Sequence, residues 1–370
     1  METIKDLYQK ALEATGKKNF SYDPQQLDCL FTPEQNIPTW NINNIINADN
    51  KTKDGKTVSR DTSAVLRALS EKKDRTAFVL IAPAFLGQFS DKVQPGMIRA
   101  AFKSIGFDGL LEVAVFADIL TLREALEFDR NIHTNQDFML TSCCCPMWLA
   151  MIKKMYTNLV PHMPPSVSPM IAAGRTVKRL HPDAITVFVG PCIAKKAEAR
   201  EKDIAGAVDF VLTFQETQEI FDLLQVNLLE QPDSIKEFSS GTGRIYARTG
   251  GVSTAVKATL ARLHPDREIA LTAQQADGIP ACREMINKLV SGSSKANFFE
   301  GMGCAGGCVG GPKSLLKKED ARNKVNAYGK AAVYKTPLDN PYVLELLTRL
   351  NFHTLEGLLN DKDFFVRKIQ

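Results

Sequence analysis

Short apolar runs alternate with amphipathic segments along most of the chain from residue 76 onward. The apolar runs predict buried strands at 76–82, 110–116, 138–140, 184–189, 210–213, 269–272 and 297–299. The segments between them predict helices over 95–105, 120–130, 148–156, 170–180, 194–200 and 214–224, and another that begins at 250–253. Because strands that alternate with helices form parallel sheets, the pattern predicts an α/β fold with parallel sheets flanked by helices.

The two ends of the chain depart from this alternation. Residues 1–75 form a lead-in segment, with a helix predicted over 4–15 and a polar region after it. Residues 76–335 are numerous enough for two lobes, and residues 336–370 are predicted to form a helical module. The lead-in contains Cys29 but no CxxCxxC run, so we expect no accessory iron–sulfur cluster in it.

Composition narrows the class of protein. The chain is 44% hydrophobic and 24% charged, as in ordinary globular proteins, and its net charge is +4. This balance does not favour a nucleic-acid partner. The sequence has neither an apolar run of about 18 residues nor a signal-peptide core at its start, so we expect a cytoplasmic protein without a membrane span. In that compartment eight cysteines favour metal binding or catalysis over a disulfide framework.

Six of the cysteines fall in three motifs, TSCCCP at 141–146, GPC at 190–192 and CAGGC at 304–308. Each motif follows a predicted strand, and sites in open α/β sheets form at the carboxyl ends of strands. Backbone N–H groups and helix N-termini at such ends also favour thiolate. The three motifs are therefore predicted to converge on one iron–sulfur site, between the lobes.

The spacing of these cysteines suits a 4Fe–4S cluster, which needs four thiolates. Cys304 and Cys308 can wrap one side of the cluster, since the glycines between them allow a close approach of the backbone. Cys145 and Cys192 are candidates for the other two positions. Two alternatives are a zinc site, which also takes four cysteines, and buried apolar thiols without a metal. Cys282, like Cys29, lies outside the motifs and is interpreted as structural.

Three segments resemble the hallmark motifs of the catalytic domain of iron–iron hydrogenases. They are TSCCCPMW at 141–148, GPCIAKKAE at 190–198 and EGMGCAGGCVGG at 300–311. Weaker similarities occur at 81–84, 117–127, 209–213 and 335–341, so that the resemblance covers about residues 76–365.

The resemblance implies reversible formation of H2 from protons and electrons at an H-cluster. This cofactor is a 4Fe–4S cube joined to a two-iron subcluster that carries CO, cyanide and a bridging azadithiolate. The implied cube ligands are Cys145, Cys192, Cys304 and Cys308, and Cys308 is the ligand shared with the two-iron unit. The implied partners are H2 and protons, an electron-transfer protein such as ferredoxin or a cluster-bearing subunit, and maturation proteins.

The resemblance also implies roles for residues around the two-iron unit. Cys144 passes protons to it, Glu124 and Glu127 continue the proton path, and Lys195 holds a cyanide. The implied surroundings of the unit are Ala82, Pro83, Ala84, Ser168, Met170, Gly190 and Met302. For the two glutamates the alternative is a solvated face of a helix over 120–130, for which Asp118 is the expected N-cap.

Several positions depart from the family pattern. Gly190 stands where Met is typical and Met170 where Gln is usual, and the expected relay serine falls on Pro164, with Ser166 as a possible substitute. Such changes resemble the divergent, sensory branches of the family. The sequence thus leaves two alternatives to an ordinary hydrogenase: an H2 sensor with slow turnover, and a non-catalytic electron-transfer subunit.

Overall fold

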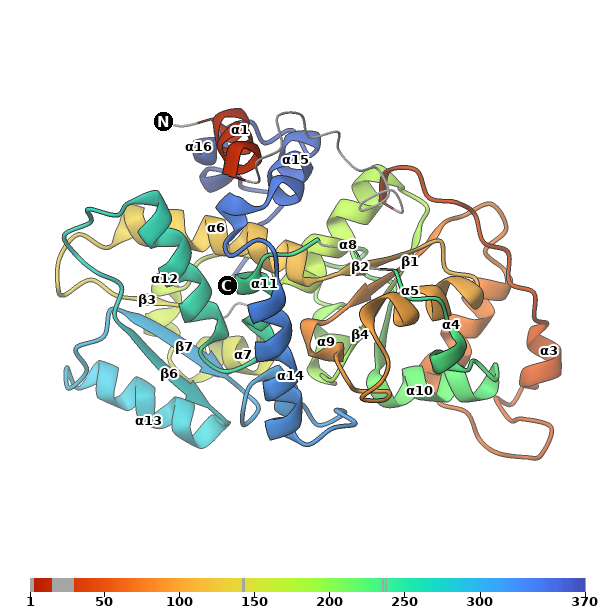
Figure 1. The fold of residues 1–370 in the computed structure, drawn as a ribbon. Coiled ribbons are helices and arrows are strands. Elements are labelled where there is room, and N and C mark those ends of the chain that lie inside the picture. Colours follow the sequence, from red (N-terminus) through yellow and green to blue (C-terminus); the bar gives the residue numbers. More distant parts are fainter. Residues whose placement is uncertain (1–2, 15–29, 142–143, 235, 237, 370) are drawn as a thin grey trace.

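The computed structural model describes residues 3–14, 30–141, 144–234, 236 and 238–369 of the chain. Two parallel sheets lie side by side in two lobes, with helices on the faces of each, and further helices pack along one side (Figure 1). The predicted α/β fold, with two lobes and a C-terminal helical module, is confirmed.

The first lobe contains four parallel strands in the order β2-β1-β4-β5. They are β1 (Ala77–Ile81), β2 (Gly109–Glu112), β4 (Ile185–Gly190) and β5 (Phe210–Thr213). Phe78 and Leu80 of β1 belong to the apolar core that includes α8 (Pro169–Leu180). Val79 and Ile81 belong to the core on the other face, with helices α4 (Arg60–Ser70), α5 (Pro95–Ser104) and α10 (Phe214–Leu223). Burial on both faces explains why β1 is a continuous apolar run.

The second lobe contains three parallel strands in the order β3-β7-β6. They are β3 (Met139–Leu140), β7 (Phe298–Met302) and β6 (Ala273–Asp277). Helix α12 (Gly251–Leu263) packs on one side, and α7 (Pro146–Met155) and α13 (Ile279–Val290) on the other. The strand predicted at 269–272 is wrong, because the paired residues are 273–277. These residues form a half-exposed edge strand, which needs no apolar run.

Helix α6 (Ala114–Asn131) contacts helices of both lobes and is buried from Ala114 to Phe128. The strand predicted at 110–116 is wrong beyond Glu112, and Asp118 is not an N-cap, since it lies inside α6. The Asp118 carboxylate is buried and accepts hydrogen bonds from the backbone N (2.6 Å) and hydroxyl (2.5 Å) of Ser240. Because α6 is buried on all sides, its first turns show no amphipathic pattern, and the sequence therefore does not indicate where the helix begins.

Helices near the two ends of the chain pack together on one side of the molecule. Helix α1 (Ile4–Ala14) packs against α15 (Pro341–Arg349), which is followed by α16 (Leu355–Leu359) (Figure 1). The remaining helices are α3 (Ile42–Ile45), α9 (Ala194–Glu198), α11 (Gly241–Arg244) and α14 (Lys318–Ala331). No helix in the described part of the chain is long and apolar enough to cross a membrane. Apart from the two strands corrected above and the start of α6, the predicted elements lie within three residues of their observed bounds.

Candidate active site

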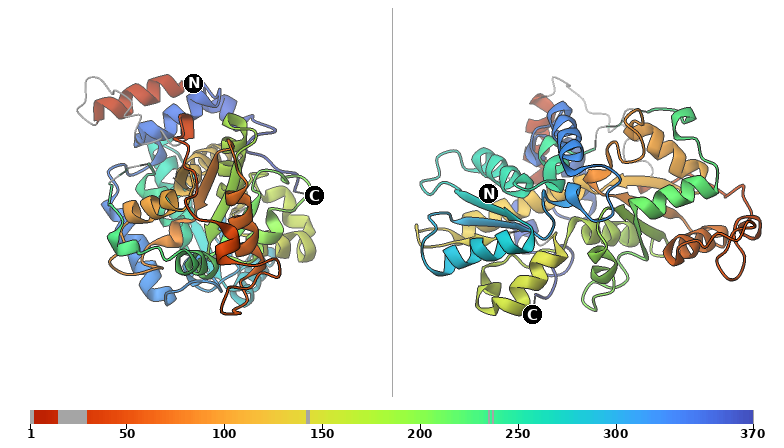
Figure 2. Two further views of the ribbon diagram at one scale, coloured as in Figure 1. Left: turned by 90° about the vertical axis from the view of Figure 1, so that its right-hand side faces the viewer. Right: turned by 90° about the horizontal axis from the view of Figure 1, so that it is seen from below.

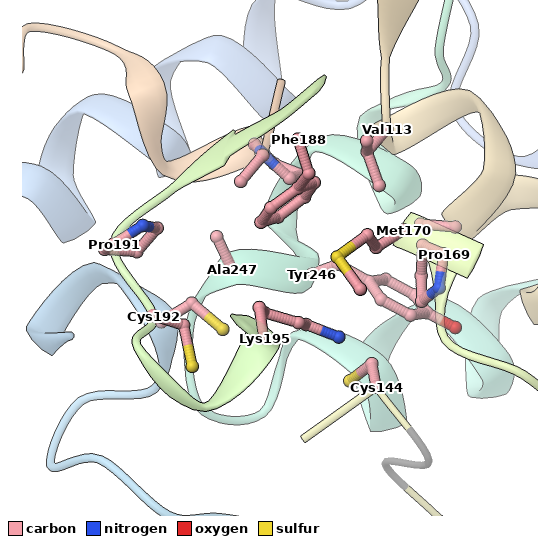
Figure 3. A pocket seen from close by; sticks show the side chains of 14 residues that line it. Val113, Cys144, Pro169, Met170, Phe188, Pro191, Cys192, Lys195, Tyr246 and Ala247 are labelled. Carbon is pink, nitrogen blue, oxygen red and sulfur yellow. The ribbon is translucent and has the colours of Figure 1, made fainter. Parts of the chain in front are cut away.

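The three cysteine motifs lie at the carboxyl ends of strands from both lobes. Cys145 follows β3 and is the N-cap residue of α7, and Cys192 lies between β4 and α9. Cys304 and Cys308 follow β7. Cys308 lines one pocket together with Cys144 and Cys192, so that the site combines residues far apart in the sequence (Figure 3). Cys143 and Cys29 lie outside the described residues.

The glycine-rich loop between Cys304 and Cys308 is shaped by its backbone. Gly306 and Gly307 have φ values of 87° and 85°, in the left-handed region that glycine tolerates. A Cβ on Gly307 would lie 2.7 Å from the backbone N of Thr249, so no larger residue fits against that segment. Just before the loop, the backbone N of Gly303 donates a hydrogen bond of 3.2 Å to Cys145 Sγ. The loop is thereby joined to the first motif.

The cysteine thiols lie in surroundings that disfavour negative charge in the absence of a metal. Burial, followed by the nearby thiols of the other motifs, raises the pKa of Cys304 to about 11 and that of Cys308 further. Burial likewise raises the pKa of Cys192. Such a set is stable as thiolates only with a cationic partner, and four cysteines with iron provide that balance.

The described residues contain no ready-made site for a single metal ion. Among the described residues, no three Cys, His, Asp or Glu side chains come close enough together to hold a single metal ion. A zinc ion needs all four sulfurs at about 2.3 Å from one point. A 4Fe–4S cluster contains four irons, and each of them takes one thiolate.

Lys195 extends from α9 into the pocket beside Cys144 (Figure 3). Its Nζ lies 2.5 Å from Glu198 Oε2, and both side chains are buried. Burial opposes the charged form of Lys195, but the charge and hydrogen bond of Glu198 outweigh it and raise the pKa of the lysine. The pocket therefore contains a permanent ammonium group, which can attract an anionic ligand.

The pocket has mostly apolar walls. Of the residues expected around a two-iron unit, Ala82, Pro83 and Met170 line it. The other four are not among its lining residues. Ala84 is buried in the first-lobe core, Ser168 is the N-cap residue of α8, and Gly190 ends β4. Met302 belongs to the second-lobe core against which Cys144 and Cys145 pack.

Two aromatic residues of the pocket were missed by the sequence reasoning. A Cβ on Gly190 would lie 2.8 Å from Cε1 of Phe188, so this ring occupies the space next to the glycine. Phe188 precedes Gly190 by two positions in β4, and alternate residues of a strand lie on the same face. This two-residue period could have indicated that Phe188 lies beside Gly190. Tyr246 also lines the pocket, and its hydroxyl is 2.8 Å from Thr121 Oγ1. No sequence pattern marks Tyr246, because it lies in a short helical turn.

Glu124 of α6 lies behind Cys144. Both residues line a small cavity, together with Ser166 and Tyr246. Glu124 Oε2 accepts a hydrogen bond of 2.7 Å from Thr141 Oγ1, and burial raises the pKa of Glu124 to about 8. Glu124 is thus a carboxyl group that can hold or release a proton near neutral pH.

Glu127 lies one turn further along α6 and lines a different, outer hollow with His162 and Pro164. Glu127 Oε1 accepts a hydrogen bond of 3.1 Å from Arg123 Nε, and Oε2 has no hydrogen-bond partner among the described residues. Glu124 and Glu127 are 4% and 1% exposed, so the solvated-face alternative is wrong. Ser166 lines the inner cavity, and Pro164 lines the outer hollow.

A two-lobed α/β domain with this cysteine set at its strand ends has the arrangement of an iron–sulfur protein. The family model described as the iron-only hydrogenase large subunit, C-terminal domain, matches residues 75–312. The chain therefore belongs to this family, whose members bind iron–sulfur clusters.

Relatives of the chain include both hydrogenases and proteins with other names. Iron hydrogenase 1 of Clostridium pasteurianum is 27% identical over 269 residues, covering 60% of this chain and 47% of that protein. The NADP-reducing hydrogenase subunit HndD of Solidesulfovibrio fructosivorans is 24% identical and covers 76% of this chain and 58% of the relative. The chain thus spans about half the length of these hydrogenases. The human nuclear prelamin A recognition factor is 26% identical and covers 78% of this chain and 75% of that protein.

Solved structures agree with the fold. The apo form of the [FeFe]-hydrogenase HydA1 from Chlamydomonas reinhardtii superposes with a TM-score of 0.68 at 20% identity. The match covers 83% of this chain and 98% of that structure. At this level of identity the likeness is one of architecture.

Proposed function

We propose that the protein is an iron–iron hydrogenase that interconverts H2 with protons and electrons at an H-cluster. The observation that supports this most directly is the pocket next to Cys308, which also exposes the Lys195 ammonium and the Cys144 thiol. A cube alone would need the four cysteines but no adjoining pocket with a cation and a proton donor.

The cofactor residues are assigned as follows. Cys145, Cys192, Cys304 and Cys308 would hold the cube, and Cys308 would also bind the two-iron unit with its CO, cyanide and azadithiolate ligands. When bound, this cofactor supplies the iron site at which the H–H bond is formed or broken. Lys195 would bind an anionic ligand of the unit, and the apolar walls would keep water away from it.

Protons would enter through residues of α6. Glu127 lines the outer hollow, and Glu124 lines the inner cavity that also contacts Cys144. Burial keeps the pKa of Cys144 well above its ordinary value, so the residue remains a thiol that can donate a proton into the pocket. Glu124, with a pKa of about 8, would restore the proton of Cys144 and be reloaded in turn from Glu127.

Electrons would enter near the cube. Met147 and Ile193 are each 46% exposed and lie within two residues of Cys145 and Cys192, respectively. Exposed apolar side chains at this position are suited to brief contact with an electron-transfer protein. We assign that role to a ferredoxin or a cluster-bearing subunit. Maturation proteins would supply the two-iron unit.

A second candidate is a protein that carries the cube without fast turnover. The named relatives include a cytosolic iron-sulfur assembly component 3 from Bos taurus, which is 25% identical over 310 residues. The two-iron pocket is also unusual, since Phe188 fills the space beside Gly190 and no hydroxyl is present at Pro164. These features favour either a non-catalytic iron–sulfur role or an H2 sensor with slow turnover.

Infrared spectroscopy separates these candidates. Protein matured with the two-iron cofactor should show CO and cyanide stretching bands and should evolve H2 from a reduced dye. A matched Cys144→Ala variant should retain the bands but lose most of the activity. Bands without activity in the wild type would support the sensor, and a cube without bands after verified maturation would refute the hydrogenase proposal.

A further inference from the structure

The C-terminal tail, residues 361–367, crosses from the helical module to the loop that contains Ser166 (Figure 2). The backbone N of Val167 donates to the carbonyl of Phe365 (2.9 Å), and the backbone N of Arg367 donates to the carbonyl of Pro165 (2.8 Å). Ser166 and Val366 form an antiparallel bridge between these two bonds. The tail therefore holds the loop whose Ser166 lines the inner cavity.

A half-buried arginine on α8, Arg175, also holds the tail. Arg175 Nη1 donates to the carbonyls of Asp363 (2.8 Å), Phe364 (2.9 Å) and Val366 (2.8 Å). Three hydrogen bonds from one cation to three carbonyls define the path of the tail much more strictly than apolar packing would.

The start of the tail reaches the partner of Glu127. Asp361 Oδ2 lies 3.4 Å from Arg123 Nη1, and Arg123 Nε donates to Glu127. The Asp361 carboxylate also accepts hydrogen bonds from the backbone N of Phe364 (3.0 Å) and Phe365 (2.6 Å). The Asp361 carboxylate thus connects the tail to Arg123, which is the ion-pair partner of Glu127.

The end of the tail reaches the partner of Lys195. The Arg367 guanidinium, whose side chain is 1% exposed, forms ion pairs with Glu201 and, at 3.3 Å, with Asp203. It also lies 3.9 Å from Glu198 Oε1, a buried oxygen with no hydrogen-bond partner among the described residues. The other oxygen of Glu198 pairs with Lys195. Glu198 is therefore placed between two cations, one in the tail and one in the pocket.

The geometry points to the C-terminal tail as a clamp on the active site, with Arg367 as a positioning residue for Lys195. Removing the Arg367 charge leaves Glu198, Glu201 and Asp203 as neighbouring carboxylates without their shared cation. Glu198 would then shift, and the Lys195 ammonium would shift with it. The inference that the clamp affects a bound anion rests on the proposed function, whereas the docking of the tail does not.

The test compares three variants of the full chain, each matured with the two-iron cofactor. Arg367→Met removes the charge and retains the length of the side chain, and Arg367→Lys restores a cation without the planar fork. Lys368→Met is the matched control, because it removes one charge from an exposed neighbour in the same tail. The readouts are the cyanide stretching bands and the amide hydrogen exchange of the segment 165–168.

We expect the cyanide bands to shift in Arg367→Met, to return part of the way in Arg367→Lys, and to remain unchanged in Lys368→Met. Exchange at 165–168 should accelerate about tenfold or more in Arg367→Met only, since the Val167 bond to the tail opens. H2 turnover should fall by roughly a hundredfold, the size expected for a small misplacement of a site residue.

Unchanged bands and unchanged exchange in Arg367→Met would overturn the inference. Faster exchange with unchanged bands would also overturn the link to Lys195. If Arg367→Met fails to fold, Glu201→Gln removes one of the ion pairs and should produce the same two changes to a smaller degree. A wild type without CO and cyanide bands would refute the proposed function, and the exchange result would still decide whether Arg367 holds the tail.

Discussion

Replacing Glu124 by Gln should make the protein more stable at alkaline pH while slowing hydrogen turnover. Glu124 is buried, and its one hydrogen bond among the described residues comes from Thr141 Oγ1 at 2.7 Å. A Gln amide oxygen can accept the same bond, and the amide has no charge to bury. The substitution thus changes the protonation chemistry of the site and leaves its shape almost unaltered.

The magnitude follows from the pKa of Glu124, which burial raises from an ordinary 4.5 to about 8. Between these two pH values the folded protein keeps the proton and the unfolded chain releases it, so rising pH favours the unfolded state. Each pKa unit corresponds to about 1.4 kcal/mol, and the whole interval to about 5 kcal/mol. Glu124 therefore reduces the free energy of unfolding progressively from about pH 4.5 to about pH 8, and Gln does not.

The assay is urea unfolding of identically prepared wild type and Glu124→Gln at pH 5, 7 and 9, with the exposed Glu268→Gln as control. The two proteins should have similar free energies of unfolding at pH 5, and the variant should be more stable by several kcal/mol at pH 9. H2 turnover of the variant should fall by about a hundredfold or more. Parallel pH curves for wild type and Glu124→Gln would refute the reasoning, because they would mean that folding does not perturb this carboxyl group.

Three further predictions concern the site and its supports. Cys144→Ser should retain the iron content of the cube and lower H2 turnover by about a hundredfold, as measured by iron analysis and dye-linked assay, since a hydroxyl is a poorer proton donor than a thiol. Gly301→Ala should cost about 3 kcal/mol in thermal unfolding, because a Cβ there would overlap the Trp148 indole; an unchanged melting temperature would contradict the packing. Ser240→Ala should lower the free energy of unfolding by about 2 kcal/mol, because the Asp118 carboxyl loses its hydroxyl partner. Burial raises the pKa of Asp118 to about 7, and the Ser240 hydroxyl opposes that rise. The destabilisation should therefore grow above pH 7, where the hydroxyl stabilises the ionised carboxylate of the wild type.

The sequence alone determined the fold class and the family. The apolar run at 76–82 predicts a strand because a strand buried on both faces needs apolar residues throughout, and β1 is such a strand. The cysteines likewise predict an iron–sulfur site from the sequence alone, since a cluster needs thiolates. Glycine lets the loop between Cys304 and Cys308 turn tightly. The comparisons with known proteins bear out the family that these motifs indicate.

Only the tertiary structure decided the environment of the polar residues. Glu124 and Glu127 have the spacing of a solvated helix face, and the packing of both lobes around α6 buries them instead. Phe188 and Tyr246 line the pocket through contacts between distant segments, which no local pattern records. The same holds for Arg367, whose role depends on Glu198, about 170 residues earlier in the chain. Burial and charge balance arise from the whole fold, whereas ligand identity and strand period are properties of short stretches of sequence.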